Sequence, residues 1–389
     1  MTKKNKRLVL ALTGIRSDYD VLYPILKAIK EHPQLSVELA VSGGHLSAWH
    51  QNSVDYVAKD GFKIVERIDN LLSNNSDATR AKGLGILTIG LVQTIERVRP
   101  DFLLTIGDRE EPMAAAIAAN YMKIPMAHVA GGDSAYGNAD DPIRHAVSKL
   151  AHIHFTTAKI HRERLIRMGE EPSRVFWVGN PALDRIRTTP RLSRKKLSSL
   201  LEFDIDHGPF IVVLQHSHSL EADQAYEQMK ITMEAVKKTG LKAIVIYPNT
   251  DPGGIEIINA INEYRGLPQI KIFRNLERLA FVNLLKQATC LVGNSSCGFL
   301  ESSFVKLPVI NIGERQKGRI NTGNILLLKH NESAIKNNIL KIAFNKQFRK
   351  KIMAKTKNIY GQGRTGAKIA QILANHKINR ELLLKKLTY

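Results

Sequence analysis

Short apolar runs alternate with segments of helical periodicity along most of this chain, and no other feature constrains its fold as strongly. The runs are rich in Leu, Ile and Val, as in strands that a parallel sheet buries on both faces. Alternation of this kind predicts parallel sheets covered by helices on both sides. The expected strands are residues 8–13, 36–42, 101–107, 125–129, 210–215, 243–247, 270–273, 290–293 and 308–312, and the expected helices of the first half are 19–29, 90–99 and 112–121.

The segment from residue 188 to residue 208 interrupts this alternation. It contains Pro190, clustered basic residues and serines, and it ends at Gly208-Pro209, a composition typical of a connection. We therefore expect one α/β domain over residues 1–187 and a second from residue 188, each a doubly wound sheet. Ligands of such sheets bind beyond the carboxyl ends of the strands, so two facing halves would hold a site in the cleft between them.

The chain is strongly basic, with a formal net charge of +21, and its basic residues concentrate between Lys346 and Lys386. Such a surface suits nucleic acid, but it also steers a small polyanion such as a nucleotide diphosphate. Few aromatic residues for base stacking accompany these charges. We therefore expect no nucleic-acid partner.

Composition bears on several other classes of protein. No apolar run approaches the roughly 18 residues of a membrane helix. The first residues imitate a signal peptide, but their apolar stretch is short and no cleavage site follows it. Cys290 and Cys297 are too few for a disulfide framework and lack the spacing of a metal site. We expect a cytoplasmic protein with no membrane partner and no metal.

Several catalytic motifs are missing. The loop after the first strand, residues 13–20, is not the G-x-G-x-x-G of a dinucleotide fold. The chain also has no phosphate loop ending in Gly-Lys-Ser/Thr, no His-Glu-x-x-His and no Gly-x-Ser-x-Gly. These absences argue against hydride transfer, ATP hydrolysis and serine-hydrolase chemistry.

Acidic residues follow several expected strands of the first half. They lie in Gly107-Asp108-Arg109, in Gly131-Gly132-Asp133 and in the run from Asp140 to His145. Each acid alone is explained by helix capping. Asp108, Asp133 and Asp140 together exceed what capping needs, and they favour acid–base catalysis.

Polar groups also follow the strands of the second half. The run Gly293-Asn294-Ser295-Ser296 is explained either by capping or by phosphate binding at a helix N-terminus. Glu301 and Arg315 come soon after it and favour a nucleotide, because arginine grips a diphosphate and a carboxylate accepts ribose hydroxyls. His216 and His218 lack a third metal ligand, so one of them is better interpreted as a general acid or base.

Taken in order, these motifs resemble the hydrolysing UDP-N-acetylglucosamine 2-epimerases of sialic-acid and related nonulosonic-acid synthesis. The resemblance runs from the Thr13–Tyr19 loop to the turn Tyr360–Gly363. It implies a GT-B-like fold of two Rossmann-type domains around a cleft, residues 1–187 and 188–363, with the C-terminal residues 364–389 packing back on the first domain. It also implies a homodimer and a reaction without metal or cofactor.

The family reaction eliminates UDP from a UDP-sugar to give a 2-acetamidoglucal, and water then adds with inversion at C2 to release a sugar of the N-acetylmannosamine type. By the family pattern Arg16, Ser295, Ser296 and Arg315 hold the diphosphate, Glu301 holds the ribose, and Arg109 lines the same cleft. The expected catalytic residues are Asp108, Asp133, Asp140 and His216, and the remaining expected substrate-binding residues are His145, Asn249 and Asp251.

One position departs from the family pattern. Several members carry a glutamate where this chain has Ala130, and Asp133 follows three residues later. Either Asp133 takes the acid–base role, or the sugar makes different contacts there. The alternative substrates are UDP-N,N'-diacetylbacillosamine and a GDP-linked counterpart. A GT-B glycosyltransferase and a basic nucleic-acid-binding protein are the alternative functions.

Overall fold

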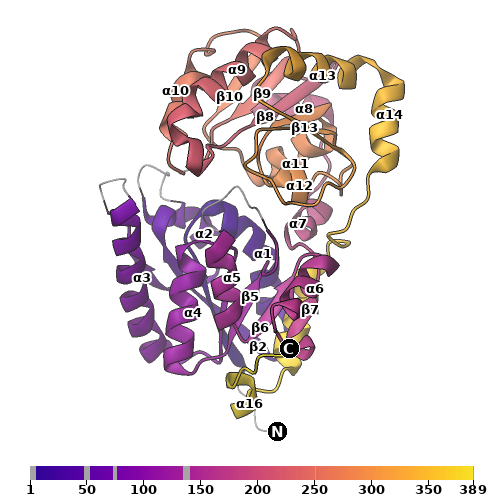
Figure 1. Cartoon of the computed structure of the whole chain (residues 1–389). Helices are drawn as coiled ribbons and strands as arrows, with labels where there is room; N and C mark the ends of the chain where they lie inside the picture. The colour runs from indigo at the N-terminus through magenta and orange to yellow at the C-terminus, as the bar shows by residue number, and fades with distance from the viewer. Residues whose placement is uncertain (1–5, 48–52, 73–76, 135–140, 250, 389) are drawn as a thin grey trace. The chain divides into compact units, whose positions relative to one another are not determined.

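The computed structural model describes residues 6–47, 53–72, 77–134, 141–249 and 251–388, and the chain divides into two compact units. Unit 1 comprises Met1–Asp133, Asp140–Arg187 and Tyr360–Tyr389, and unit 2 comprises Ser134–Ala139 and Thr188–Ile359 (Figure 1). The C-terminal segment thus returns to the unit in which the chain began. No helix in the described ranges has both the length and the apolar character that crossing a membrane requires.

Unit 1 is built on a parallel sheet of seven strands in the order β3-β2-β1-β4-β5-β6-β7. The strands are β1 (Arg7–Thr13), β2 (Leu35–Ser42), β3 (Lys63–Ile68), β4 (Phe102–Ile106), β5 (Met126–Val129), β6 (Ile153–Thr156) and β7 (Val175–Trp177). The helices are α1 (Arg16–Glu31), α2 (Val54–Lys59), α3 (Asp77–Val98), α4 (Glu110–Met122), α5 (Asp141–Leu150), α6 (Lys159–Arg167), α7 (Ala182–Thr188), α15 (Thr365–Asn375) and α16 (Arg380–Leu383), with short 3-10 turns η1 (Gly43–Leu46) and η3 (Pro172–Arg174).

Unit 2 is built on a second parallel sheet of six strands in the order β10-β9-β8-β11-β12-β13. The strands are β8 (Phe210–Leu214), β9 (Lys242–Ile246), β10 (Ile270–Phe273), β11 (Cys290–Gly293), β12 (Val309–Ile312) and β13 (Ile325–Leu328). The helices are α8 (Arg194–Leu201), α9 (Ala225–Lys237), α10 (Gly254–Asn262), α11 (Arg278–Gln287), α12 (Cys297–Leu300), α13 (Glu332–Phe344) and α14 (Lys346–Lys355), with a 3-10 turn η4 (Ser219–Gln224). The prediction of two parallel-sheet α/β domains is confirmed.

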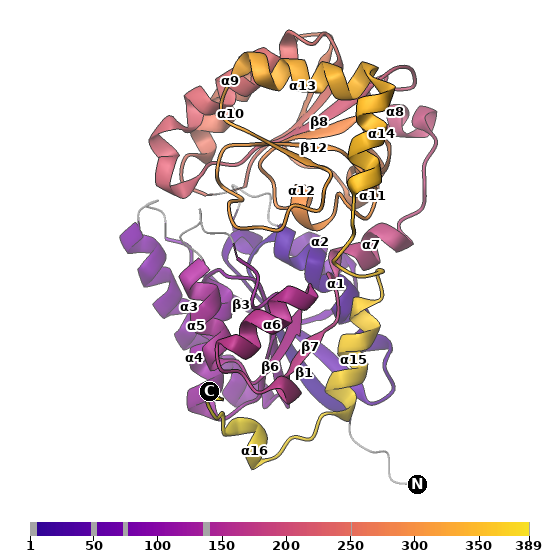
Figure 2. The same ribbon diagram turned by 45° about the vertical axis from the view of Figure 1, so that its right-hand side comes forward.

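The strands are apolar throughout because both faces of each sheet are covered. In β1, Val9 and Ala11 join a core shared with α1 and α15, whereas Leu10 and Leu12 join a core shared with α3 and α4. α15 packs directly against α1, so the C-terminal segment completes one face of the first sheet (Figure 2). Free Cys290 and Cys297 are both buried in unit 2.

Four strands, β3, β6, β7 and β13, lie outside the segments predicted from the sequence, as do α2, α5, α6, α7 and the first half of α3. β3 and β13 are only partly buried, and β7 is short and ends in an exposed tryptophan, so none of them forms the uniform apolar run of a central strand. The helix expected over residues 90–99 is the second half of α3, which begins at Asp77. Edge position explains why β3, β7 and β13 were missed, because an edge strand is covered less completely than a central one. β6 is an internal strand of only four residues.

Each sheet has one point where the strand order reverses. The polar loops that follow the two strands at this point lie next to each other. In unit 1 the reversal lies between β1 and β4, and in unit 2 between β8 and β11. At such a switch point the loops after the two strands turn to opposite faces of the sheet and leave a crevice for a ligand. The residues after β1 and β4, and those after β8 and β11, are therefore the first candidates for a site.

Candidate functional site

The switch point of unit 1 gathers four carboxyl groups and an arginine. Asp18 comes from the first turn of α1, and Asp108, Arg109, Glu110 and Glu111 follow β4. Burial raises the pKa of Asp18 to about 8, with Glu111, Asp108 and Glu110 adding to the rise and Arg109 opposing it. Asp18 is therefore largely protonated at neutral pH. Asp18 was not among the residues predicted from the sequence, because an acid in the first turn of a helix is ordinarily explained by its interaction with the helix dipole.

Arg144 of α5 connects carboxylates from the loop after β4, the loop after β5 and the first turn of α5. It forms an ion pair with Asp108, and its nitrogens lie 3.9 Å from Asp133 Oδ2 and 3.9 Å from Asp141 Oδ1. Its side chain is 4% exposed, whereas that of Asp108 is 22% exposed and accessible to a ligand. The structure thus brings Asp108 and Asp133 together through an arginine to which the sequence analysis gave no role.

Asp133 is held on its other side by α6. Asp133 Oδ1 lies 3.3 Å from His161 Nε2, and His161 Nδ1 lies 2.9 Å from Thr157 Oγ1. The Asp133 residue is 3% exposed. This carboxylate is thus buried in a network between α5 and α6.

Ala130, the position that departs from the family pattern, adopts φ 69°, in the left-handed region. Its carbonyl accepts a hydrogen bond from Arg144 Nη1 at 3.3 Å, and its N–H donates to Phe155 O at 2.9 Å. A strained backbone held by its surroundings is common beside ligand sites. The residue contributes its main chain to the site, with only a methyl group as side chain.

Glu111 is the most confined acid of this switch point. Its carboxylate lies against Gly14, where an added Cβ would come within 1.6 Å of Glu111 Oε1, and against Gly43, where the distance would be 3.1 Å. Glu111 is 5% exposed, and Oε2 has no hydrogen-bond partner among the described residues. Burial raises the pKa of Glu111. Gly14 after β1 and Gly43 after β2 leave room for the Glu111 carboxylate, and these two glycines are the sign of its position that the sequence contains.

Three further residues of unit 1 were expected in the site. The structure describes Arg16 and His145 but not Asp140. The Arg16 guanidinium stacks over the Tyr56 ring at 4.6 Å. His145 Nε2 lies 3.5 Å from Asp141 Oδ2, and its side chain is 30% exposed. Asp140 belongs to residues 135–140, which lie outside the described residues.

The switch point of unit 2 is closed by a reciprocal pair of hydrogen bonds. His216 N donates to Asn294 Oδ1 at 2.7 Å, and Asn294 Nδ2 donates to His216 O at 2.9 Å. Asn294 therefore joins the loops after β8 and β11. The helix-capping explanation of this run is wrong for Asn294, whose side chain is engaged here, and for Ser296, whose side chain makes no capping bond to α12.

His216 has a defined tautomer. Asn249 N donates to His216 Nδ1 at 3.0 Å, so Nδ1 is the acceptor and the ring proton lies on Nε2. Burial and the charge of Arg315 lower the pKa of His216 to about 3. At neutral pH this imidazole is uncharged and offers one N–H. The second histidine, His218, lies 3.4 Å from Glu221 Oε1, and no group of metal-ligating side chains occurs among the described residues.

Arg315 is fixed beside the same loops. It donates to Ser217 O at 3.1 Å, to Asn294 O at 3.5 Å and to Asp251 Oδ2 at 3.1 Å. Gln316 Nε2 also donates to Asn294 O at 2.9 Å. A guanidinium has five N–H donors. Arg315 therefore keeps donors beyond these three bonds, in a rigid orientation suited to an anion.

The remaining residues expected to bind the nucleotide surround α12. Ser295 Oγ accepts from Cys297 Sγ at 3.2 Å, and Ser295 is 8% exposed. Glu301 is also 8% exposed, and its Oε2 lies 3.8 Å from Arg278 Nη2. Arg278 comes from α11, and the sequence analysis missed it because the two residues share no local motif. The structure thus gathers His216, Asn249, Asp251, Asn294 and Arg315 in one network, and Glu301 in a second contact with α11.

Comparison with known proteins gives a consistent result. A sequence model described as UDP-N-acetylglucosamine 2-epimerase matches residues 27–374. The UDP-N,N'-diacetylbacillosamine 2-epimerase (hydrolyzing) of Legionella pneumophila is 34% identical over 379 residues, 97% of this chain and 98% of that protein. The GDP/UDP-N,N'-diacetylbacillosamine 2-epimerase (hydrolyzing) of Campylobacter jejuni is 32% identical over 327 residues, 83% of this chain and 84% of that protein.

The fold is also found in solved structures. The UDP-GlcNAc 2-epimerase of Neisseria meningitidis bound to UDP-GlcNAc has a TM-score of 0.79 at 18% identity and covers 95% of this chain and 100% of that one. The putative UDP-N-acetylglucosamine 2-epimerase of Listeria monocytogenes has a TM-score of 0.77 at 20% identity and covers 93% and 94%. At such identities the likeness concerns the fold alone, and it confirms the expected GT-B-like architecture.

Proposed function

This chain belongs to the UDP-N-acetylglucosamine 2-epimerase family, and from that premise we propose that it is a hydrolysing 2-epimerase of a UDP-linked acetamido sugar. The products would be UDP and the free sugar inverted at C2. The observation that carries this proposal is the family match over residues 27–374, which includes Asp108 of the first switch point and the polar residues of the second.

The substrate we propose first is UDP-N,N'-diacetylbacillosamine. Two relatives that carry this sugar in their names are 34% and 32% identical to the chain. The UDP-N-acetylglucosamine 2-epimerase of Neisseria meningitidis is 28% identical over 311 residues. UDP-N-acetylglucosamine, the substrate expected from the motifs, is therefore the second choice. The small side chain of Ala130 is a further reason to expect a sugar other than N-acetylglucosamine.

The chemistry requires two kinds of groups. The hydrogen at C2 is barely acidic until the bond from C1 to the diphosphate oxygen lengthens and positive charge develops at C1. A base then takes the C2 proton, the electron pair of that C–H bond forms the C1=C2 double bond, and UDP leaves with the electron pair of its C–O bond. An acid then donates a proton to C2 on the opposite face, where the electron pair of the C1=C2 double bond forms the new C–H bond. The oxygen of a water molecule bonds to C1 and gives up one proton to the solvent.

Unit 1 is suited to the two proton transfers. We assign the base to Asp108, which is accessible and oriented by Arg144. We assign the acid to Asp18, since its pKa of about 8 keeps it protonated at neutral pH. An acid–base pair is usually recognised by two carboxyl groups whose environments give them different pKa values. Asp133 has the role of orienting Arg144, and Asp140 stays an expected catalytic residue.

Unit 2 is suited to the leaving group. Arg315 and the Nε2–H of neutral His216 would donate to the diphosphate, together with Ser295 and Ser296, and Glu301 would accept from the ribose. Donors fixed before the reaction stabilise charge that develops on the diphosphate without having to reorient. Arg315 is fixed in this way by Ser217 O, Asn294 O and Asp251.

A panel of UDP- and GDP-sugars in heavy water, followed by NMR, tests the proposal. We expect free UDP and a free manno-configured sugar that carries deuterium at C2, with UDP-N,N'-diacetylbacillosamine turned over fastest. Preference for UDP-N-acetylglucosamine would reverse the order of the two substrates. A product formed only when an acceptor sugar is added would contradict hydrolysis and identify a glycosyltransferase.

A further inference from the structure

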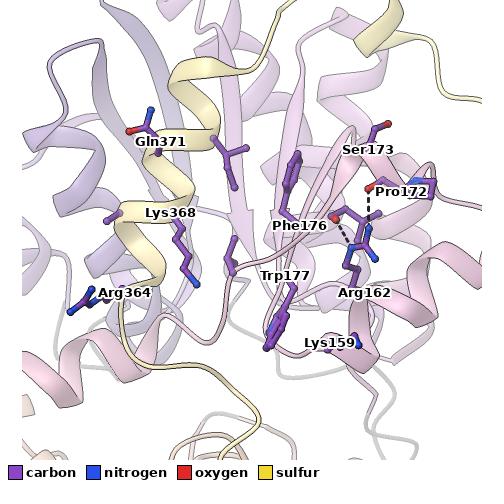
Figure 3. Close-up of a pocket in the computed structure, with 13 residues that line it drawn as sticks. Lys159, Arg162, Pro172, Ser173, Phe176, Trp177, Arg364, Lys368 and Gln371 are labelled. Carbon is purple, nitrogen blue, oxygen red and sulfur yellow. Dashed lines mark hydrogen bonds between the residues drawn. The ribbon is translucent and has the colours of Figure 1, made fainter.

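A surface groove of unit 1 lies between α6, the edge strand β7 and α15, and the proposed reaction does not use it (Figure 3). Its volume is about 900 Å³, and it is open to solvent. The buried residues in its lining, Val175 and Val178, are apolar, and Phe176 and Ile372 lie half-buried beside them. The groove therefore offers an apolar strip along the margin of the sheet.

The lining of this groove is strongly basic. It includes Lys159, Arg162, Arg364 and Lys368 but no carboxylate. Arg364 precedes α15, and Lys368 follows one turn later and extends toward the strand (Figure 3). No carboxylate in the described ranges forms an ion pair with Arg364 or Lys368, and Lys159 has only a 4.0 Å contact with Glu163. An anionic ligand would therefore meet cations on both sides of the strip.

Arg162 determines how a ligand can use the edge of the sheet. It donates to Val175 O at 3.0 Å and to Pro172 O at 3.5 Å (Figure 3). Val175 belongs to β7, so the Arg162 side chain competes with a further strand for this carbonyl of the sheet edge. A ligand in the groove must be recognised mainly through its side chains.

Trp177, the last residue of β7, is 48% exposed in the lining of this groove. A half-exposed tryptophan next to arginine is typical of the centre of a protein-binding surface. A nucleic acid strand would need successive aromatic platforms, and Trp177 is the one large exposed aromatic in the lining. From these observations we infer that the groove binds an acidic, extended segment of a partner protein, with its carboxylates on the basic margins and an apolar side chain against Trp177.

The chain carries two tryptophans, Trp49 and Trp177, so fluorescence can report on the groove. In a Trp49→Phe background, a synthetic peptide of glutamates interrupted by single leucines should change the Trp177 emission saturably. The same peptide with glutamine in place of glutamate should not. The double variant R364E/K368E should weaken binding of the acidic peptide about tenfold. Calorimetry on the wild-type protein gives the same affinity if Trp49→Phe does not fold.

The matched control is K350E/K351E, which changes the net charge equally at two exposed lysines of α14 in unit 2. It should bind the peptide within about twofold of wild type at moderate salt. An equal loss in this control, or tighter saturation by a single-stranded DNA oligonucleotide, would overturn the inference. Epimerase turnover should be unchanged in R364E/K368E, so failure of the groove and failure of the proposed function are separate results.

Discussion

Asn294 and His216 exchange two hydrogen bonds, 2.7 Å and 2.9 Å long, across the switch point of the second sheet. Replacing Asn294 with Ala removes both bonds and leaves the partly buried main chain of His216 without these partners. We expect unfolding to cost about 1–3 kcal/mol less and UDP to bind more weakly, because the loops after β8 and β11 lose their connection. Thermal unfolding and calorimetric titration with UDP measure the two effects.

Asn331→Ala is the control for this variant. The Asn331 side chain caps α13 by accepting from Ala334 N at 2.8 Å, away from the polar network. Its loss should cost about 1 kcal/mol of stability and leave UDP affinity unchanged. If both variants lowered UDP affinity equally, the coupling of Asn294 to the nucleotide would be refuted.

Asp108→Asn tests the assigned base. The amide keeps the shape of the side chain but cannot take a proton, so we expect turnover to fall about 10²–10⁴-fold while UDP binds normally. Steady-state release of UDP and calorimetric titration separate the two quantities. Asp204→Asn, which affects an exposed ion pair with Lys242, should leave both at wild-type values. Undiminished turnover in Asp108→Asn would remove this residue from the reaction.

Central strands and the loops that follow them could be predicted from the sequence, since apolar runs and the polar residues after them are local. The partnership of Arg144 with Asp108 could not, because it depends on α5 lying beside the loop after β4. The same holds for Arg278 beside Glu301, which come from separate elements of unit 2. Motifs locate strand ends, but strand order decides which of those ends meet.

The raised pKa of Asp18 predicts that the stability of the protein depends on pH. Its pKa is raised from 3.8 to about 8, so between these values the folded protein binds more protons at this site than the unfolded chain. Stability conferred by the protonated group is therefore complete below about pH 4 and is lost as pH rises through 8. Asp18→Asn cannot ionise, and its stability relative to wild type should rise from pH 4 to pH 9 by up to about 6 kcal/mol. Urea unfolding at several pH values measures this difference, and parallel curves for the two proteins would disprove the raised pKa.

Arg315→Ala removes a guanidinium that already holds Asp251, Ser217 O and Asn294 O. We expect UDP to bind about 10–100-fold more weakly, because the phosphate loses its donors and Asp251 is left with less compensation. Lys317→Ala is a suitable control, since Lys317 lies two residues after Arg315, is exposed and forms an ion pair with the exposed Glu314. An unchanged affinity for UDP in Arg315→Ala would place the diphosphate elsewhere.

His216 should act as a neutral donor throughout the physiological pH range. Its pKa of about 3 and the bond from Asn249 N to Nδ1 together place one proton on Nε2. Nitrogen chemical shifts of His216 should therefore not titrate between pH 5 and pH 8.

Two substitutions distinguish the ring nitrogens of His216. In His216→Gln the amide N–H lies near the former Nε2, and in His216→Asn the amide oxygen lies near the former Nδ1. If the Nε2–H donates to the diphosphate, the Gln variant keeps most of the affinity for UDP, and the Asn variant loses about tenfold while it retains the bond from Asn249. The reverse order would mean that His216 serves only to hold the loop after β9. Titration of both variants with UDP at pH 7 therefore decides between a ligand contact and a structural role.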